Sequence, residues 1–527
     1  NINSLNANEI KDISRESKFK EIYNRYESIK KNKGFIDFDD MLSICYEILK
    51  KNDRILNYFR ETYQYIQLDE AQDTSTIQFA IVELMARPKN NLFLLGDTNQ
   101  SILSFRASDI NYLLNFGNNF PDGTIYFMQK NFRSTKDIVE LSNEFIKNNT
   151  ERYDIDMVTD KNHQRPVTIV KLDDGNSEIE YVVEKIKESN GYSKNAVLFR
   201  NNLSCVPLVE KFRKESIPFY VKDHDNKFFS HWVVSDILAF IDLALDPNDF
   251  DSLSRIYYKT RLYINKGTIY DSIKKNDGSG CLNALLRLSS LTDSQRINVN
   301  SFKGYLILLR RAKGSGIIDL IRHDMEYGRY LENNAEKMGN SLDGLLNILY
   351  VLENLLEDCE NITDVREKLS MIQSLMKSSS KNKNKDAVTL STMHGSKGLE
   401  WDNVYILSMV DGVFPSSQAI AKLKDGDPTL LEEERRLCYV AITRGRNYVD
   451  LCVPASLNYK SVAQSKFIRE LNSILTGEDE EDPSIFAIGD SVSHKKFGVG
   501  KVIDVNSGDD IIIINFNGVV KRLLYSI

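Results

Sequence analysis

The sequence predicts a multidomain α/β protein that also contains a helical insertion and a small β module. Its 527 residues are more than one hydrophobic core can organise, so we expect three or four domains. Short apolar runs alternate with helical stretches, which is typical of parallel sheets with crossover helices. Between about residues 225 and 375 the strand pattern disappears, and amphipathic helices such as the one around Leu342–Leu355 dominate.

The elements follow in a clear order along the chain. The first 60 residues have apolar side chains at helical spacing. The predicted strands are Tyr65–Leu68, Leu92–Leu95, Ile125–Met128, Val167–Val170, Ala196–Phe199, Val388–Leu390, Val404–Leu407 and Tyr448–Val453. The acidic segment Gly477–Pro483 indicates a boundary. Residues 486–527 then form short apolar runs punctuated by glycines, which predicts an all-β module.

The composition is typical of a globular protein without a membrane partner. No run approaches the roughly 18 apolar residues of a membrane span, and the chain opens on polar residues, so we expect a cytoplasmic protein. Six scattered cysteines without a C-x-x-C motif favour buried free thiols over a zinc site or disulfides. The net charge of −7 does not indicate nucleic-acid binding, although a single strand in a groove needs only local positive charge.

Paired carboxylates follow the first predicted strand. Asp69 and Glu70 should lie at the carboxyl edge of a parallel sheet, where open α/β folds bind ligands. One carboxylate could hold Mg²⁺ against nucleotide phosphates while its neighbour activates a water molecule. Acidic residues also simply stabilise helix N-termini, and these two residues alone leave both interpretations open.

Two further segments strengthen the phosphate interpretation. Gly96–Ile102 follows the second predicted strand and includes Gln100, a neutral group able to sense a phosphate. In Gln129–Thr135, Phe132 stands beside Arg133, which suits base stacking next to phosphate neutralisation.

Two more segments lie late in the chain. Ser391–Trp401 combines hydroxyls, glycines and a lysine, which suits contact with phosphates at the level of the backbone. Glu432–Arg444 has the pattern of an amphipathic helix. Arg444 lies just past its apolar stripe, where we expect a side chain free to act as an arginine finger.

Together the five segments resemble motifs II to VI of UvrD/PcrA/Rep-type superfamily 1 DNA helicases. They read DEAQD, GDTNQSI, QKNFRST, TMHGSKGLEW and EEERRLCYVAITR, in the family's order and spacing, and the similarity extends over nearly the whole chain. The resemblance implies ATP and Mg²⁺ as cofactors, and single-stranded DNA and single-strand/duplex junctions as partners. It also implies ATP-dependent 3′-to-5′ translocation with duplex unwinding, in DNA repair or replication.

The resemblance assigns a role to each matching position. The nucleotide roles would be held by Asp69 (Mg²⁺ ligand), Glu70 (hydrolytic water), Gln100 (coupling of the γ-phosphate to DNA), Phe132 (adenine stacking), Arg133 (γ-phosphate), Glu400 (nucleotide contact) and Arg444 (arginine finger). The DNA contacts would be made by Phe105, Thr392, His394 and Lys397.

The resemblance also implies a division into domains. The expected parts are two RecA-like parallel-sheet motor domains, a helical insertion, an acidic linker and a small Tudor-like β-barrel, which in the family contacts RNA polymerase. The first motor domain, incomplete and with trailing helices of its insertion at the start, would span 1–125. The second motor domain would span 126–225 and 385–475, with the helical insertion at 226–384. The acidic linker would be 476–485 and the β-barrel 486–527.

This sequence departs from the family's pattern in two places. Leu103 and Ala107 replace a usual tyrosine and glycine at the DNA-facing motif, which puts the strength of base stacking there in question. No G-x-x-x-x-G-K-[ST] phosphate loop occurs, and the nearest segment, Gly498–Lys501, is followed by Val502 instead of Ser or Thr. We therefore expect a fragment of a longer helicase that is inactive alone. The alternative is a non-catalytic module that retains DNA or RNA polymerase contacts.

Overall fold

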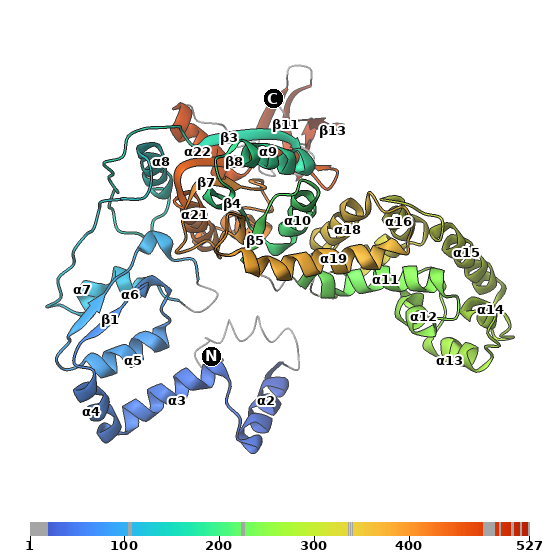
Figure 1. The fold of residues 1–527 in the computed structure, drawn as a ribbon, viewed down its shortest axis with the longest axis horizontal. Helices are drawn as coiled ribbons and strands as arrows, with labels where there is room; N and C mark the ends of the chain where they lie inside the picture. The colour runs from blue at the N-terminus through green and yellow to red at the C-terminus, as the bar shows by residue number, and fades with distance from the viewer. Residues whose placement is uncertain are drawn as a thin grey trace. The chain divides into compact units, whose positions relative to one another are not determined.

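The computed structural model divides into two units, which are described separately. The described residues are 19–103, 108–222, 227–335, 337, 339, 341–477, 491–494, 497–506, 511–516 and 519–524. Backbone contacts assign residues 1–127 and 151–153 to the first unit, and 128–150 and 154–527 to the second (Figure 1).

The first unit contains a two-stranded parallel sheet in which Ile66 pairs with Leu92. Its elements are α2 (Phe19–Lys33), α3 (Phe38–Lys51), α4 (Asp53–Thr62), β1 (Ile66–Leu68), η2 (Ala71–Asp73), α5 (Thr76–Ala86), β2 (Leu92–Leu94), η3 (Thr98–Gln100), α6 (Asn111–Leu114) and α7 (Phe116–Asn119). The α5 crossover begins with a capping box between Ser75 and Gln78. Its Phe79 is buried and stacks on Tyr112, so this helix closes a small core against the sheet.

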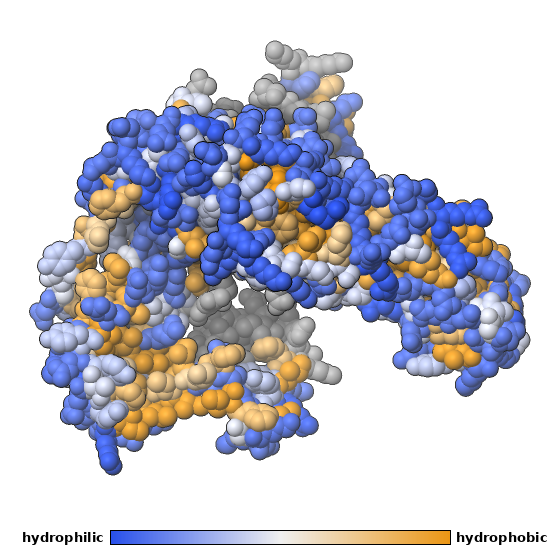
Figure 2. Space-filling model, in the orientation of Figure 1, coloured by the Kyte–Doolittle hydropathy of each residue, from blue (hydrophilic) through white to orange (hydrophobic). Residues whose placement is uncertain are grey.

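Apolar side chains are exposed on the helices that precede this sheet (Figure 2). No side chain of α2 is buried, and its exposed residues Phe19, Ile22, Tyr26 and Ile29 recur at helical spacing. In α3, Phe38 is 87% exposed. Parallel sheets usually have both faces covered, yet Phe93 in β2 is 57% exposed.

The second unit is built on a seven-stranded sheet in the order β3-β8-β7-β4-β6-β5, with β9 antiparallel to β8. The other neighbouring pairs are parallel, which confirms the predicted parallel sheet. The strands are β3 (Thr168–Asp174), β4 (Asn195–Phe199), β5 (Phe219–Val221), β6 (Val388–Thr392), β7 (Trp401–Ile406), β8 (Gly445–Leu457) and β9 (Lys460–Ser461). All five residues of β4 are buried, because helices cover both faces of a central parallel strand.

The helices around this sheet are α8 (Lys136–Ile146), α9 (Gly175–Glu188), α10 (Cys205–Lys214), α20 (Ser417–Lys424), α21 (Thr429–Ile442) and α22 (Lys466–Thr476). α9 and α10 share one core with Val197 and Cys452 of the sheet. α8 and α21 contact β8, and α21 also contacts β7.

Between β5 and β6, the described residues form helices and connecting loops but no strands. They are α11 (Trp232–Leu245), α12 (Phe250–Ile256), α13 (Lys266–Lys274), α14 (Cys281–Leu286), α15 (Asp293–Leu309), α16 (Gly316–Asp319), α17 (Tyr327–Asn334), α18 (Leu342–Leu356) and α19 (Asp364–Ser378). A buried ion pair lies inside: Lys259 Nζ is 2.6 Å from Asp236 Oδ2, which also accepts a hydrogen bond from the Tyr327 hydroxyl at 2.7 Å.

The C-terminal strands form a four-stranded antiparallel sheet, β10 (Ser491–His494), β11 (Gly498–Asn506), β12 (Ile511–Phe516) and β13 (Val519–Leu524). A Cβ at Gly500 would lie 2.5 Å from the Phe516 ring, so only glycine fits there. The predicted all-β module is confirmed, whereas its closure into a barrel stays a prediction. Most of the acidic linker, residues 478–485, lies outside the described residues.

Three sequence predictions need correction or qualification. Ile125–Met128 is not a strand: these side chains are exposed, and no strand pairs with the segment among the residues that the structure describes. β5 and β9, of three and two residues, were not predicted. All six cysteines are free, but Cys45 is exposed while the other five are buried.

Two findings concern metals and membranes. No cluster of three or more His, Cys, Asp or Glu side chains suited to a metal ion occurs within the described part of the chain. Within the same residues, no helix has the length and apolar character required to cross a bilayer.

Candidate functional site

In the first unit, the paired carboxylates lie where β1 ends. Asp69 and Glu70 are both exposed, and Asp69 Oδ1 accepts a hydrogen bond from the Glu70 N–H at 2.8 Å. Glu70 has the left-handed backbone conformation, with φ 51° and ψ 40°. The next N–H, of Ala71, donates to the carbonyl of Leu95 at 2.9 Å, which ties the end of β1 to the end of β2. Two oxygen-rich side chains at the carboxyl edge of a sheet suit Mg²⁺ and a water molecule.

Gln100 lies beyond β2 in the same network. Its Nε2 donates to Asp97 Oδ2 at 2.8 Å. The backbone N–H of Asp97 donates to Oε1 of the buried Gln72 at 3.0 Å, and Gln72 Nε2 donates to Glu70 Oε2 at 2.6 Å. The structure therefore connects Glu70 with Gln100. Sequence reasoning did not assign a role to Gln72 or Asp97, because the burial of Gln72 and its two contacts appear only in the tertiary structure.

In the second unit, Phe132 and Arg133 follow a turn stabilised by Asn131. Asn131 Oδ1 accepts the N–H groups of Arg133 at 2.8 Å and of Ser134 at 2.9 Å. The Ser134 hydroxyl donates to the carbonyl of Gly445 at 2.7 Å, which anchors the turn to β8. The Phe132 ring is 74% exposed, with Lys130 Nζ 5.4 Å from its centroid. An exposed ring beside cations can stack on a base.

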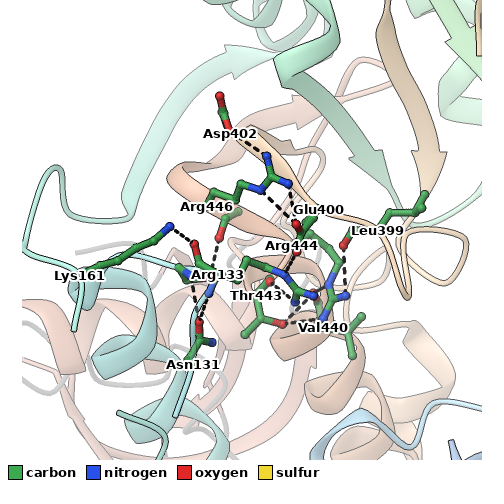
Figure 3. A network of polar contacts seen from close by, with 12 residues as sticks. Asn131, Arg133, Lys161, Leu399, Glu400, Asp402, Val440, Thr443, Arg444 and Arg446 are labelled. Carbon is green, nitrogen blue, oxygen red and sulfur yellow. Dashed lines mark hydrogen bonds and ion pairs between the residues drawn. The ribbon is translucent and has the colours of Figure 1, made fainter. Parts of the chain in front are cut away.

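Glu400 lies between two arginines (Figure 3). Arg446 Nη2 donates to Oε1 at 2.5 Å, and Arg133 Nε donates to Oε2. Hydrogen bonds from Arg446 and then Arg133 hold the pKa of Glu400 at about 2, well below its ordinary value of 4.5. Arg133 and Glu400 are 267 positions apart in the sequence, so only the tertiary fold brings them together. Arg446 was not among the predicted site residues.

Arg444 lies beside this cluster but is buried, with 2% exposure (Figure 3). It donates from Nε to the carbonyl of Val440 at 2.8 Å, from Nη1 to that of Leu399 at 3.2 Å, and from Nη2 to the Thr443 hydroxyl at 3.1 Å. The expectation of a free side chain is therefore wrong in this conformation. The physical reason is that α21 ends at Ile442, so the Val440 carbonyl in its last turn lacks an intrahelical donor, and the Arg444 guanidinium donates to it.

Thr392 is the last residue of β6, and His394 and Lys397 lie in the compact turn that follows it. Thr392 Oγ1 accepts the Gly395 N–H at 3.0 Å, and the Lys397 N–H donates to the His394 carbonyl at 3.3 Å. All three side chains are half-buried. Burial and, to a smaller extent, the charge of Arg200 lower the pKa of His394 to about 4. This histidine is therefore neutral at physiological pH.

The fourth predicted DNA contact, Phe105, lies outside the described residues, as does Ala107. Taken by themselves, the described residues define an α/β protein with a large parallel sheet, in which Arg133 and Glu400 meet from segments far apart in sequence.

Comparison with protein-family models identifies the family of this α/β protein. The model for the UvrD-like helicase C-terminal domain matches residues 126–453, and the model for the UvrD/REP helicase N-terminal domain matches residues 2–121. The chain therefore belongs to the UvrD-like, superfamily 1 helicases, as its motifs predicted.

Individual relatives are similar over most of this chain. The putative ATP-dependent DNA helicase YjcD of Bacillus subtilis is 30% identical over 462 residues, which are 85% of this chain and 59% of YjcD. The ATP-dependent DNA helicase PcrA of Staphylococcus epidermidis is 28% identical over 533 residues, 92% of this chain and 72% of PcrA. PcrA of Staphylococcus aureus has the same identity and coverage over 546 residues. The chain thus spans 59% of one relative's length and 72% of the others'.

Proposed function

We propose that this chain is the motor region of an ATP-dependent DNA helicase that moves 3′ to 5′ along single-stranded DNA. The observation that carries the proposal is the convergence of Arg133, Glu400 and Arg444, from three distant segments, at one site of the second unit. The relatives, whose names describe ATP-dependent DNA helicases, support it.

We assign nucleotide chemistry to the following residues, each considered within its own unit. Asp69 would hold Mg²⁺, and Glu70 would orient and deprotonate the attacking water. Gln100 would sense the γ-phosphate. Bound ATP supplies the phosphoryl group and the free energy, and the Phe132 ring would stack on its adenine.

Arg133 and Arg444 would act differently from each other. Arg133 is partly exposed and would exchange its bond with Glu400 for a phosphate, while Arg446 keeps Glu400 paired. Arg444 would have to leave three acceptors, each worth about 1 kcal/mol, before it could reach a phosphate. Its action as an arginine finger therefore requires rearrangement of the end of α21.

The remaining assignments are also proposals. Residues 1–125 would be part of the first motor domain, with 126–225 and 385–475 as the second and 226–384 as its helical insertion. Phe105 would stack on a DNA base, and Thr392, at the end of β6, would contact the DNA strand together with His394 and Lys397 of the following turn. The β module of residues 486–527 would contact RNA polymerase.

ATP hydrolysis by this chain, with and without single-stranded DNA, tests the proposal, with Glu70→Gln as the inactive control. Because these 527 residues contain no G-x-x-x-x-G-K-[ST] loop, we expect this chain alone to hydrolyse ATP no faster than the Glu70→Gln control. Turnover that rises with DNA and disappears in Glu70→Gln supports a motor, and strand displacement from 3′-tailed but not 5′-tailed duplexes would establish the polarity.

Fluorescence anisotropy with a labelled oligonucleotide examines the DNA contacts separately. Lys397→Ala should weaken binding, whereas exposed Lys313→Ala, in the helical segment, is the control. DNA binding that Lys397→Ala weakens would support the proposed contacts. Absence of both activities would overturn the proposal.

A further inference from the structure

Gln72 makes polar contacts in two directions from a buried position. It is 1% exposed, with Nε2 2.6 Å from Glu70 Oε2 and Oε1 3.0 Å from the Asp97 nitrogen. The orientation of its carboxamide is determined by chemistry. An ionised carboxylate only accepts and a backbone N–H only donates, so a flipped carboxamide would lose both hydrogen bonds.

The connection continues on the far side of Asp97. Asp97 Oδ2 accepts from Gln100 Nε2 at 2.8 Å, and Asp97 Oδ1 accepts the Asn99 N–H at 2.9 Å. An unbroken series of hydrogen bonds therefore joins Glu70, Gln72, Asp97 and Gln100. It links the ends of β1 and β2, although Gln72 and Asp97 are 25 positions apart.

The packing around Gln72 leaves its side chain little freedom. A Cβ at Gly96 would lie 2.8 Å from Gln72 Oε1, so the backbone of the neighbouring segment approaches the carboxamide directly. The Ser101 hydroxyl also donates to the backbone carbonyl of Gln72, at 3.3 Å. Glu70, by contrast, is exposed and has a left-handed backbone, a conformation that surrounding contacts must maintain in a residue other than glycine.

We propose that Gln72 is a positioning residue that orients the Glu70 carboxylate and couples it to the Asp97–Gln100 segment. Hydrogen bonds to charged groups are the stronger ones, so a buried donor at 2.6 Å restricts an otherwise mobile carboxylate. A change at Glu70 then reaches Gln100 through the Gln72 carboxamide. The consequence for ATP hydrolysis rests on the proposed function, whereas the coupling itself does not.

Hydrogen exchange without nucleotide tests the coupling in the full chain. The reporter is the Asp97 amide, whose acceptor is Gln72 Oε1, and the internal reference is the Leu95 amide, which donates to Leu68 O. Gln72→Met should accelerate exchange at Asp97 roughly five- to tenfold, since one hydrogen bond is lost. Glu70→Ala should accelerate it less, by about two- to threefold, because the carboxamide loses one of its two anchors.

The double variant shows whether the effect passes through Gln72. Glu70→Ala combined with Gln72→Met should exchange no faster at Asp97 than Gln72→Met alone, because the path is already broken. Gln67→Met, on the exposed side of β1, is the matched control and should change neither amide.

Additive effects at Asp97, or an Asp97 amide unchanged by Gln72→Met, would overturn the proposal. Equal acceleration at Leu95 would also overturn it, since that indicates general loosening of the sheet. These outcomes are separate from the motor function, because absent ATP turnover leaves the exchange pattern unaffected.

Discussion

Arg446 donates two hydrogen bonds to the same oxygen of Glu400, from Nη2 at 2.5 Å and from Nε at 3.2 Å. Arg133 donates to the other oxygen, so the carboxylate is held between two guanidinium groups. Glu400 is thereby kept ionised to very low pH, and its charge balances that of a neighbouring arginine whenever the other one moves away.

Removing Arg446 should change the ionisation of Glu400. In Arg446→Met, the pKa of Glu400 should rise from about 2 toward 4.5, because its largest stabilising contact is lost. Arg133→Met should raise it less. Carboxyl carbon chemical shifts followed through a pH titration measure this directly. Arg165→Met is the control, because Arg165 pairs with Asp450 in the same sheet and should leave the pKa of Glu400 unchanged.

Gly96→Ala should destabilise the first unit by about 1–3 kcal/mol, the usual effect of overpacking. The new methyl carbon would lie 2.8 Å from Gln72 Oε1 and 2.9 Å from Leu113 Cδ1. Gly117→Ala, where nothing lies within 4 Å, is the matched control and should be neutral or slightly stabilising. Native-state hydrogen exchange of α5 reports the stability of this unit, and equal effects of the two substitutions would refute the packing argument.

The Arg435–Glu470 pair should be important for stability of the second unit. Nη2–Oε1 and Nε–Oε2 are 2.8 and 2.9 Å apart, and Arg435 is 4% exposed. Arg435→Met leaves the largely buried Glu470 carboxylate without this partner, and should lower the free energy of unfolding by about 3–5 kcal/mol. Adding Glu470→Met should recover most of this loss.

Urea unfolding followed by tryptophan fluorescence suits this measurement, because both tryptophans, Trp232 and Trp401, lie in the second unit. Arg329→Met provides a control, since Arg329 is exposed and 3.7 Å from Glu326. It should change the free energy of unfolding by less than about 0.5 kcal/mol. A small effect of Arg435→Met would mean that water reaches Glu470.

Glu178 should make the second unit less stable as pH rises. Burial raises the pKa of this carboxyl to about 8, although both its oxygens accept from Ser408, the N–H at 2.5 Å and the hydroxyl at 3.0 Å. A pKa raised on folding gives stability that is complete below the unfolded value and is lost as pH rises through the folded value. The loss should therefore fall between about pH 4.5 and 8.

The neutral isostere identifies the group responsible. Glu178→Gln can still contact Ser408. The melting temperature of this variant should not fall between pH 5 and 8, whereas that of the unsubstituted chain should. Scanning calorimetry at several pH values provides the comparison. If both proteins lose stability equally over this interval, the titrating group is another residue.

The agreement between sequence and structure depends on how local each feature is. β4 was predictable because Ala196–Phe199 is a continuous apolar run, as is typical of a buried parallel strand. Asp69 and Glu70 were found because they follow a short, mainly apolar strand. The apolar run Ile125–Met128 misled for the same reason: four hydrophobic residues do not make a strand where no neighbour supplies hydrogen bonds, and none does so among the described residues.

By itself the sequence determined the family and the parallel α/β sheet, because these depend on residue type and on spacing along the chain. Only the tertiary structure decided that Arg444 is buried against backbone carbonyls, that Arg446 rather than a motif residue completes the pairing of Glu400, and that Gln72 joins two loops. Side-chain partners of this kind depend on where separate loops meet and on which donors remain unsatisfied there, and neither is encoded in local periodicity.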